Sequence, residues 1–271
     1  MNRKGCYFLM NRIFILLFLL FSIVSQAAAT VQFDTTDDSI GCGDSSIFDN
    51  LTSLTIGGWF LIDTVEDSGR MVVKWGINNT VGSERQLIMT FSGTEEFICG
   101  VREGTAAVFS LWASTGANLV ADTWYHLACT WTADNTWVFY VDGSSVTSTV
   151  FSDSGTGVST GAGATPFEVG RSTLQQAGNL DMDASDVALW SSVLTANEVA
   201  QLAKSKGKRM PLQISPSTLL VYLPLDEEED GTSADGDTFR DLSNNGLSCT
   251  GSDGANNTGL TAVAETVLTY P

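Results

Sequence analysis

The sequence predicts an all-β protein whose antiparallel strands form a two-sheet sandwich or a barrel. Short apolar and β-branched runs recur along the chain, separated by clusters of Gly, Asn, Asp and Ser. The 26 glycines and five prolines fit many turns and few helices. A dense series of short strands with turn residues between them is typical of sandwiches and barrels.

Ten apolar runs are expected to supply strands. In chain order they are residues 54–62, 70–75, 86–91, 96–101, 108–112, 124–131, 136–141, 167–169, 187–190 and 219–225. Asp142 and Gly143 lie between two β-rich runs, and both residue types tolerate the positive φ angles of a tight two-residue turn. We therefore expect a β-hairpin at this point.

One short helix is expected after residue 195. Thr195 and Glu198 have the spacing of a capping box, and Val199 and Leu202 follow at helical spacing. Residues 211–271 hold one clear apolar run, which is too little for an independent core. We expect this C-terminal extension to add strands and loops to the same sandwich.

The first 29 residues have the pattern of a secretory signal peptide. Basic residues precede an apolar run over 13–24, and three alanines end at Ala29. The apolar run is shorter than the roughly 20 residues of a spanning helix. Translation can begin at Met1 or at Met10. We expect cleavage after Ala29, a secreted or cell-surface location and no membrane insertion of the mature chain.

The charge of the chain excludes several partners. Cleavage would remove three basic residues and no acidic one, which takes the formal charge from -18 to -21. Such a charge works against binding to nucleic acid and to anionic lipid, because both are polyanions. The single histidine, His126, excludes mechanisms that need two histidines, such as a multi-His metal centre.

Four cysteines remain after cleavage: Cys42, Cys99, Cys129 and Cys249. Export makes disulfides possible, and four cysteines allow three pairings that the sequence does not separate. Cys99 and Cys129 both lie in strand-like runs, so they are the first candidate pair. The alternative is that all four are small buried residues.

Several segments resemble, in the same order, those of laminin-G-like and pentraxin-like domains within the concanavalin A-like group. The clearest are T-W-Y-H-L-A-C-T-W at 123–131, F-Y-V-D-G at 139–143 and S-D-V-A-L-W at 185–190. The resemblance extends from residue 31 to residue 202. It implies an antiparallel two-sheet jelly-roll sandwich over 30–210, preceded by the signal peptide (1–29) and followed by the extension (211–271). It also implies rim loops that bind calcium, sugars or protein partners.

Calcium is the candidate cofactor. It takes six to eight oxygen ligands from carboxylates, amides and carbonyls on loops. Three loops are rich in such oxygens, at 34–38, 181–186 and 226–245. The first and last strands of a jelly roll are neighbours, so these loops could meet at one edge. The candidate ligands are Asp34, Asp38, Asp186, Asp241 and Asn244. The alternative is that the acidic loops are ordinary solvated surface.

Sugar binding needs aromatic faces with polar groups beside them, and Trp75, Trp112 and Tyr140 are the candidate rings. No catalytic residue is predicted. The alternating glutamates of a sandwich glycosidase are missing, and Asp181 with Asp183 is the nearest pattern. His126 lies in a strand beside core residues, which favours a structural role over catalysis.

The sequence thus predicts a secreted, non-catalytic binding module that recognises a glycan or a cell-surface protein through rim loops. Two alternatives stay open. One is a structural or adhesive protein of a cell surface, filament or virion. The other is a carbohydrate-active hydrolase or lyase, which would need two carboxylates about 5–10 Å apart in an open groove.

Overall fold

The computed structural model describes residues 29–33, 38–64, 68–75, 85–103, 108–153, 159–171, 180–226, 233–253 and 260–264. The predicted signal peptide lies outside these residues except for Ala29. No helix in the described part of the chain is both long and apolar enough to cross a membrane.

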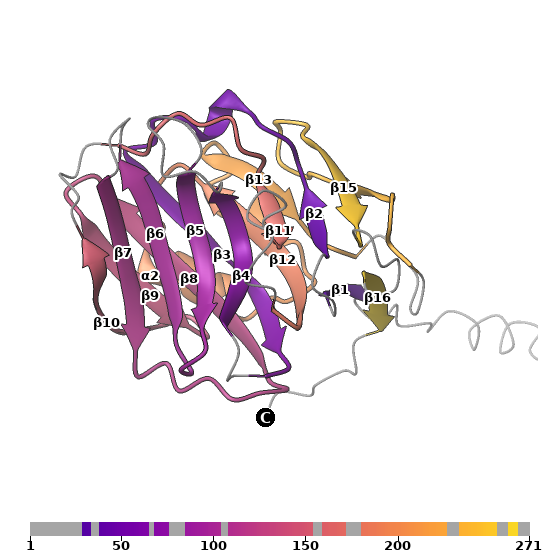
Figure 1. Ribbon diagram of the computed structural model, residues 1–271, viewed down its shortest axis with the longest axis horizontal. Helices are drawn as coiled ribbons and strands as arrows, with labels where there is room; N and C mark the ends of the chain where they lie inside the picture. The colour runs from indigo at the N-terminus through magenta and orange to yellow at the C-terminus, as the bar shows by residue number, and fades with distance from the viewer. Residues whose placement is uncertain are drawn as a thin grey trace, which may run out of the picture.

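The strands form two layers, which confirms the predicted sandwich (Figure 1). The front sheet has the order β14 (Thr238–Arg240), β15 (Ser248–Ser252), β2 (Ser39–Gly41), β11 (Glu168–Gly170), β4 (Ser68–Trp75), β5 (Arg85–Ser92), β6 (Phe97–Glu103) and β7 (Val108–Thr115). The back sheet has the order β9 (Thr136–Val141), β8 (Trp124–Thr132), β3 (Ser53–Ile62), β12 (Met182–Trp190), β1 (Ala29–Phe33) and β16 (Thr261–Ala264), and β13 (Leu219–Leu223) also pairs with β12. β10 (Ser144–Asp153) pairs with β9 and β7 and so joins the two sheets at one side.

The main core lies between the sheets and follows from the alternation of side chains along each strand. On β3, Leu54, Ile56 and Phe60 are buried in this core. On β8, Leu127 and Trp131 point the same way. Because successive strand residues face opposite sides of a sheet, residues adjacent to these positions, such as Thr55, Gly57 and Ala128, lie on the outer face.

Two disulfides cross-link the strands, one between the layers and one within the front sheet. Cys99 on β6 is bonded to Cys129 on β8, so this bridge joins the front sheet to the back sheet and confirms the predicted pair. Cys42, which follows β2, is bonded to Cys249 on β15. The alternative of four unpaired buried thiols is therefore wrong.

The hairpin and the helix are both confirmed. Asp142 and Gly143 connect β9 to β10 with φ angles of 48° and 76°, as a two-residue hairpin turn requires. Helix α2 (Ala196–Leu202) has Thr195 as its N-cap, and Glu198 completes the capping box. A Cβ atom on Gly143 would lie 2.7 Å from the Cα atom of Ala200, so only glycine allows α2 to approach the hairpin this closely.

Helix α2 and the short 3-10 helix η2 (Met210–Leu212) cover the outer face of the back sheet. A second apolar cluster fills the space between these helices and the sheet. It is formed by Ala128, Tyr140, Ala188, Trp190, Leu194, Val199, Leu202, Ile214, Leu219 and Tyr222. The back sheet is consequently buried on both faces in this region, with the main core on one side and the second cluster on the other.

A buried lysine fixes one loop at the rim of the front sheet. Lys74 on β4 is fully buried, and its Nζ donates to the backbone oxygens of Gly163 and Thr165. The same Nζ forms an ion pair with Asp44 at 2.5 Å. These contacts anchor the segment that leads into β11.

The residues after 210 supply strands to both sheets. β13 pairs with β12 and β16 pairs with β1 in the back sheet, whereas β15 pairs with β2 in the front sheet. Only the run at 219–225 was expected to be a clear strand. β14, β15 and β16 were missed because they are short and, in β15, made mostly of Ser, Thr and Gly.

The two disulfides predict different losses of stability. The bridge Cys42–Cys249 spans 207 residues and the bridge Cys99–Cys129 spans 30. Loop-closure entropy gives about 5 kcal/mol for the first and about 3.5 kcal/mol for the second. Replacing both cysteines of each pair by Ala should therefore destabilise the protein more at 42/249, as measured by urea unfolding. A larger loss at 99/129 would contradict this ranking.

Candidate functional site

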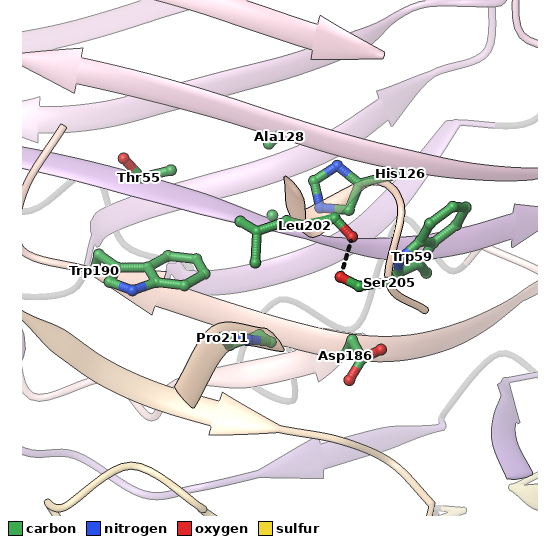
Figure 2. Close-up of a pocket in the computed structure, with 10 residues that line it drawn as sticks. Thr55, Trp59, His126, Ala128, Asp186, Trp190, Leu202, Ser205 and Pro211 are labelled. Carbon is green, nitrogen blue, oxygen red and sulfur yellow. Dashed lines mark hydrogen bonds between the residues drawn. The ribbon is translucent and has the colours of Figure 1, made fainter. Parts of the chain in front are cut away.

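A small pocket lies on the outer face of the back sheet, under the turn that follows α2 (Figure 2). β3, β8 and β12 form its floor, and the segment after α2 forms its cover. Its lining residues are Thr55, Gly57, Trp59, His126, Ala128, Asp186, Trp190, Leu202, Ser205 and Pro211. The pocket has room for about one water molecule, which is far less than a sugar ring needs.

Close packing of the sheet explains the size of the pocket. Gly57 lies on its floor, and a Cβ atom there would come within 2.7 Å of the Cβ atom of Ala128. Ser205 donates hydrogen bonds to the carbonyl oxygens of Gln201 and Leu202, so it ends the helix rather than facing a ligand (Figure 2).

Asp186 is the most constrained polar residue of the pocket. It lies at a bulge in β12 with a φ angle of 52°, and its side chain is 7% exposed. Its two carboxylate oxygens accept hydrogen bonds from the Tyr222 hydroxyl and the Gly207 backbone N–H, each at 2.5 Å. One carboxylate therefore ties β12 to β13 and to the turn after α2.

Burial raises the pKa of the Asp186 carboxyl to about 6, although its two hydrogen bonds oppose the shift. Asp226 raises this pKa further and Lys206 lowers it. Burial, together with the charge of Asp186, raises the pKa of the Tyr222 hydroxyl above its ordinary value. Tyr222 therefore stays a hydrogen-bond donor to Asp186 at neutral pH.

His126 is a neutral ring packed against tryptophan. Its side chain is 3% exposed and meets Trp59 edge-on, with ring centroids 5.6 Å apart. Burial lowers the pKa of His126 to about 3, so the ring is uncharged at pH 7. Its Nδ1 atom has no hydrogen-bond partner in the described part of the chain. A histidine that is neutral and enclosed in this way has the structural role that its strand context predicts.

Four of the five predicted calcium ligands lie in the described part of the chain, and the three carboxylates among them are not grouped as a metal site. Asp34 lies outside the described residues, Asp38 is buried at the start of β2, and Asn244 is exposed. Within the described ranges, no group of three or more His, Cys, Asp and Glu residues is arranged to hold a metal ion. Both oxygens of Asp186 already accept protein donors, so Asp186 does not fit a calcium shell in this arrangement.

Asp241 caps the open edge of β13. Its carboxylate accepts hydrogen bonds from the backbone N–H groups of Tyr222, Ser243 and Leu247 and from the Ser243 hydroxyl. Asn245 donates from its side chain to the carbonyl oxygens of Leu219 and Leu220 on the same strand. The loop after β14 thus supplies hydrogen-bond partners to the backbone groups along this edge of β13. The Asp241 oxygens, which were predicted to bind calcium, take part in these bonds.

Two aspartates, Asp63 and Asp181, meet where β3 ends and β12 begins. Burial raises the pKa of Asp63, whose side chain is hydrogen-bonded to that of Asp181, and Asp122 adds to the rise. Retaining glycosidases hold their two carboxyl groups about 5 Å apart and inverting ones hold them farther apart. Two carboxyl groups in hydrogen-bond contact are closer than either arrangement.

The predicted sugar-binding rings lie in three different places. Trp75 is 5% exposed and packs beside Phe109, with ring centroids 5.7 Å apart, on the outer face of the front sheet. Trp112 is partly buried against the main core, and Tyr140 belongs to the second apolar cluster. The three rings therefore do not line one groove.

Among the described residues, the most exposed aromatic side chain is one that the sequence did not single out. Phe151 on β10 is 62% exposed, and Val150 beside it is 49% exposed. The signal for it in the sequence is the strand predicted after the Asp142-Gly143 turn, which carries an aromatic residue among serines and threonines.

Comparisons with known proteins agree with this architecture. Residues 34–200 match the family described as the concanavalin A-like lectin/glucanases superfamily. No curated protein matches the chain. A putative carbohydrate-binding protein from Bacteroides ovatus superposes with a TM-score of 0.59 at 16% identity, over 88% of this chain and 60% of that one. A heptameric SAP-like pentraxin from Limulus polyphemus gives a TM-score of 0.50 at 17% identity, over 69% of this chain and 86% of that one.

Asp186 predicts a pH dependence of stability. Its pKa is about 6 in the folded protein against 3.8 for an ordinary Asp carboxyl, so the folded state binds this proton more tightly. This tighter proton binding adds about 3 kcal/mol to the free energy of unfolding below about pH 4. The added stability is lost as pH rises through 6. In Asp186→Asn, the amide can donate to Tyr222 and its oxygen can accept from Gly207, so this contribution should vanish.

Urea unfolding at pH 4 and pH 7 tests this prediction. Asp186→Asn should gain stability relative to the wild type on going from pH 4 to pH 7. Glu95→Gln, which changes an exposed carboxylate, serves as the control and should follow the wild type. A parallel pH profile for Asp186→Asn and the wild type would show that folding does not raise the pKa of Asp186.

The matched family covers more than half of the chain, and the two-sheet architecture agrees with it. The chain belongs to the concanavalin A-like lectin/glucanase superfamily, as a member with laminin-G-like features.

Proposed function

We propose that this protein is a secreted, non-catalytic module that binds a glycan or a glycosylated cell-surface partner. Three observations support the proposal: membership of a lectin and glucanase superfamily, structural likeness to a carbohydrate-binding protein, and two disulfides of the kind that form in exported proteins. The family match over 34–200 carries most of the weight.

We expect the proposed ligand to bind on the surface, and the small size of the pocket supports this expectation. The pocket under α2 holds about one water molecule, and its ionisable groups are enclosed by protein contacts. A sugar would instead contact the rims or the outer strands of the sandwich. The formal charge of -18 favours an uncharged ligand over an anionic polymer.

Calcium assistance is a separate part of the proposal. Asp186 and Asp241 are engaged by protein donors, so the remaining candidates are Asp34, Asp38 and Asn244, together with ligands in loops outside the described residues. If calcium binds the folded state selectively, it must raise the melting temperature of the protein.

A structural or adhesive role is the second candidate function. The exposed apolar side chains of Val150 and Phe151 on β10 favour it, because such residues also occur at contacts between subunits. No comparable observation in the described part of the chain favours the hydrolase or lyase.

Binding of the purified mature chain to an array of neutral and acidic glycans tests the proposal. We expect binding to neutral glycans, in calcium and in chelator, with a higher melting temperature in calcium if the ion is held. An absence of glycan binding together with concentration-dependent self-association would support the structural role. An unchanged melting temperature would remove calcium from the proposal.

A further inference from the structure

We propose that Phe151, displayed by a bulge in β10, is the stacking platform of a subsite for a neutral glycan, with the hydroxyls of Thr149 and Ser152 beside it. This inference rests on the proposed function and assigns it a surface. The surface lies at the side of the sandwich where β10 joins the two sheets (Figure 1).

The bulge determines how the ring is presented. β10 pairs with β9 through residues 144–146 and with β7 through residues 147–153. In the second part the register shifts between Val150 and Ser152, so Phe151 is the extra residue that has no partner on β7. Bulges of this kind re-aim side chains and are frequent next to binding sites.

The ring is available to a ligand. Among the described residues, Phe151 is the one aromatic side chain in the exposed range, and all ten residues of β10 are at least partly exposed. Phe151 and the neighbouring Val150 together leave apolar surface on β10 that a ligand can contact.

Hydroxyl groups surround the ring. Six of the ten residues of β10 are Ser or Thr. Thr149 and Ser152 lie opposite Ala113 and Leu111 on β7, and neither side chain has a hydrogen-bond partner among the described residues. Each hydroxyl can both donate and accept, as the hydroxyl groups of a sugar require. Half-buried Leu111 adds an apolar surface beside them.

The charge of the strand identifies the class of ligand. Asp153 is the one charged residue of β10, and its carboxylate accepts a hydrogen bond from the Asn135 side chain. A cationic ligand would find no second carboxylate on this strand, and the acidic chain repels anions. An uncharged sugar needs no second carboxylate and is not repelled by the acidic chain, and its C–H face can stack on an aromatic ring.

A second copy of the chain is the competing occupant. An exposed strand edge can pair with another strand, but a bulge interrupts the regular row of backbone groups that such pairing uses. The bulge at Phe151 lies in the middle of the segment that pairs with β7. The structure therefore favours the sugar over edge-to-edge association.

Two substitutions with a control test the subsite. Phe151→Ala should weaken binding to the best neutral glycan by about tenfold, which corresponds to the loss of one stacked ring. Phe151→Trp should keep or strengthen the binding. Val193→Ala removes another exposed apolar side chain, in the loop before α2, and should leave the binding unchanged. Calorimetric titration measures the affinities, and equal melting temperatures verify folding.

The possible outcomes separate this inference from the function on which it rests. If the wild type binds a glycan and Phe151→Ala binds it equally well, the subsite is wrong and the proposed function stands. If the wild type binds no glycan, both are overturned. If the wild type is a dimer that Phe151→Ala dissociates without a change in glycan binding, the surface belongs to a second copy and the subsite is overturned.

Discussion

The back sheet is buried on both faces, and most of the structure depends on this constraint. Its inward residues build the main core, whereas its outward residues pack under α2 and η2. Residues of a strand in such a position are mostly apolar or hydrogen-bonded. Thr55 fits this pattern through hydrogen bonds with Ser192 and Leu194. Gly57 fits it by having no side chain, which leaves space for Ala128 on β8.

Asp186 is the exception that connects the covering segment to the sheet. A buried carboxylate loses hydration, and this loss has to be offset by hydrogen bonds from protein donors. Tyr222 and Gly207 supply two such bonds from two different segments. The bulge in β12 turns Asp186 toward them, so a local irregularity of one strand positions both β13 and the turn after α2.

The sequence predicted the features that depend on local chemistry. The hairpin followed from Asp142 and Gly143, and the helix followed from Thr195 and Glu198. The features that depend on distant partners were not predictable. Asp241 looked like a metal ligand because one sequence does not reveal that its oxygens cap the edge of β13. Phe151 was overlooked because its exposure results from a register shift between two strands, and periodicity cannot show such a shift.

The pairing of β1 with β16 places the two ends of the described chain in one ladder. β1 lies between β12 and β16, and Ala29 stands opposite Ala264. β1 is synthesised first, yet one of its two neighbours is synthesised last. β1 must therefore wait until synthesis is almost complete before its second edge is satisfied. The back sheet is therefore complete only after β16 has been made. Because β1 and β16 are far apart in the sequence, we expect their pairing to be a slow step of folding.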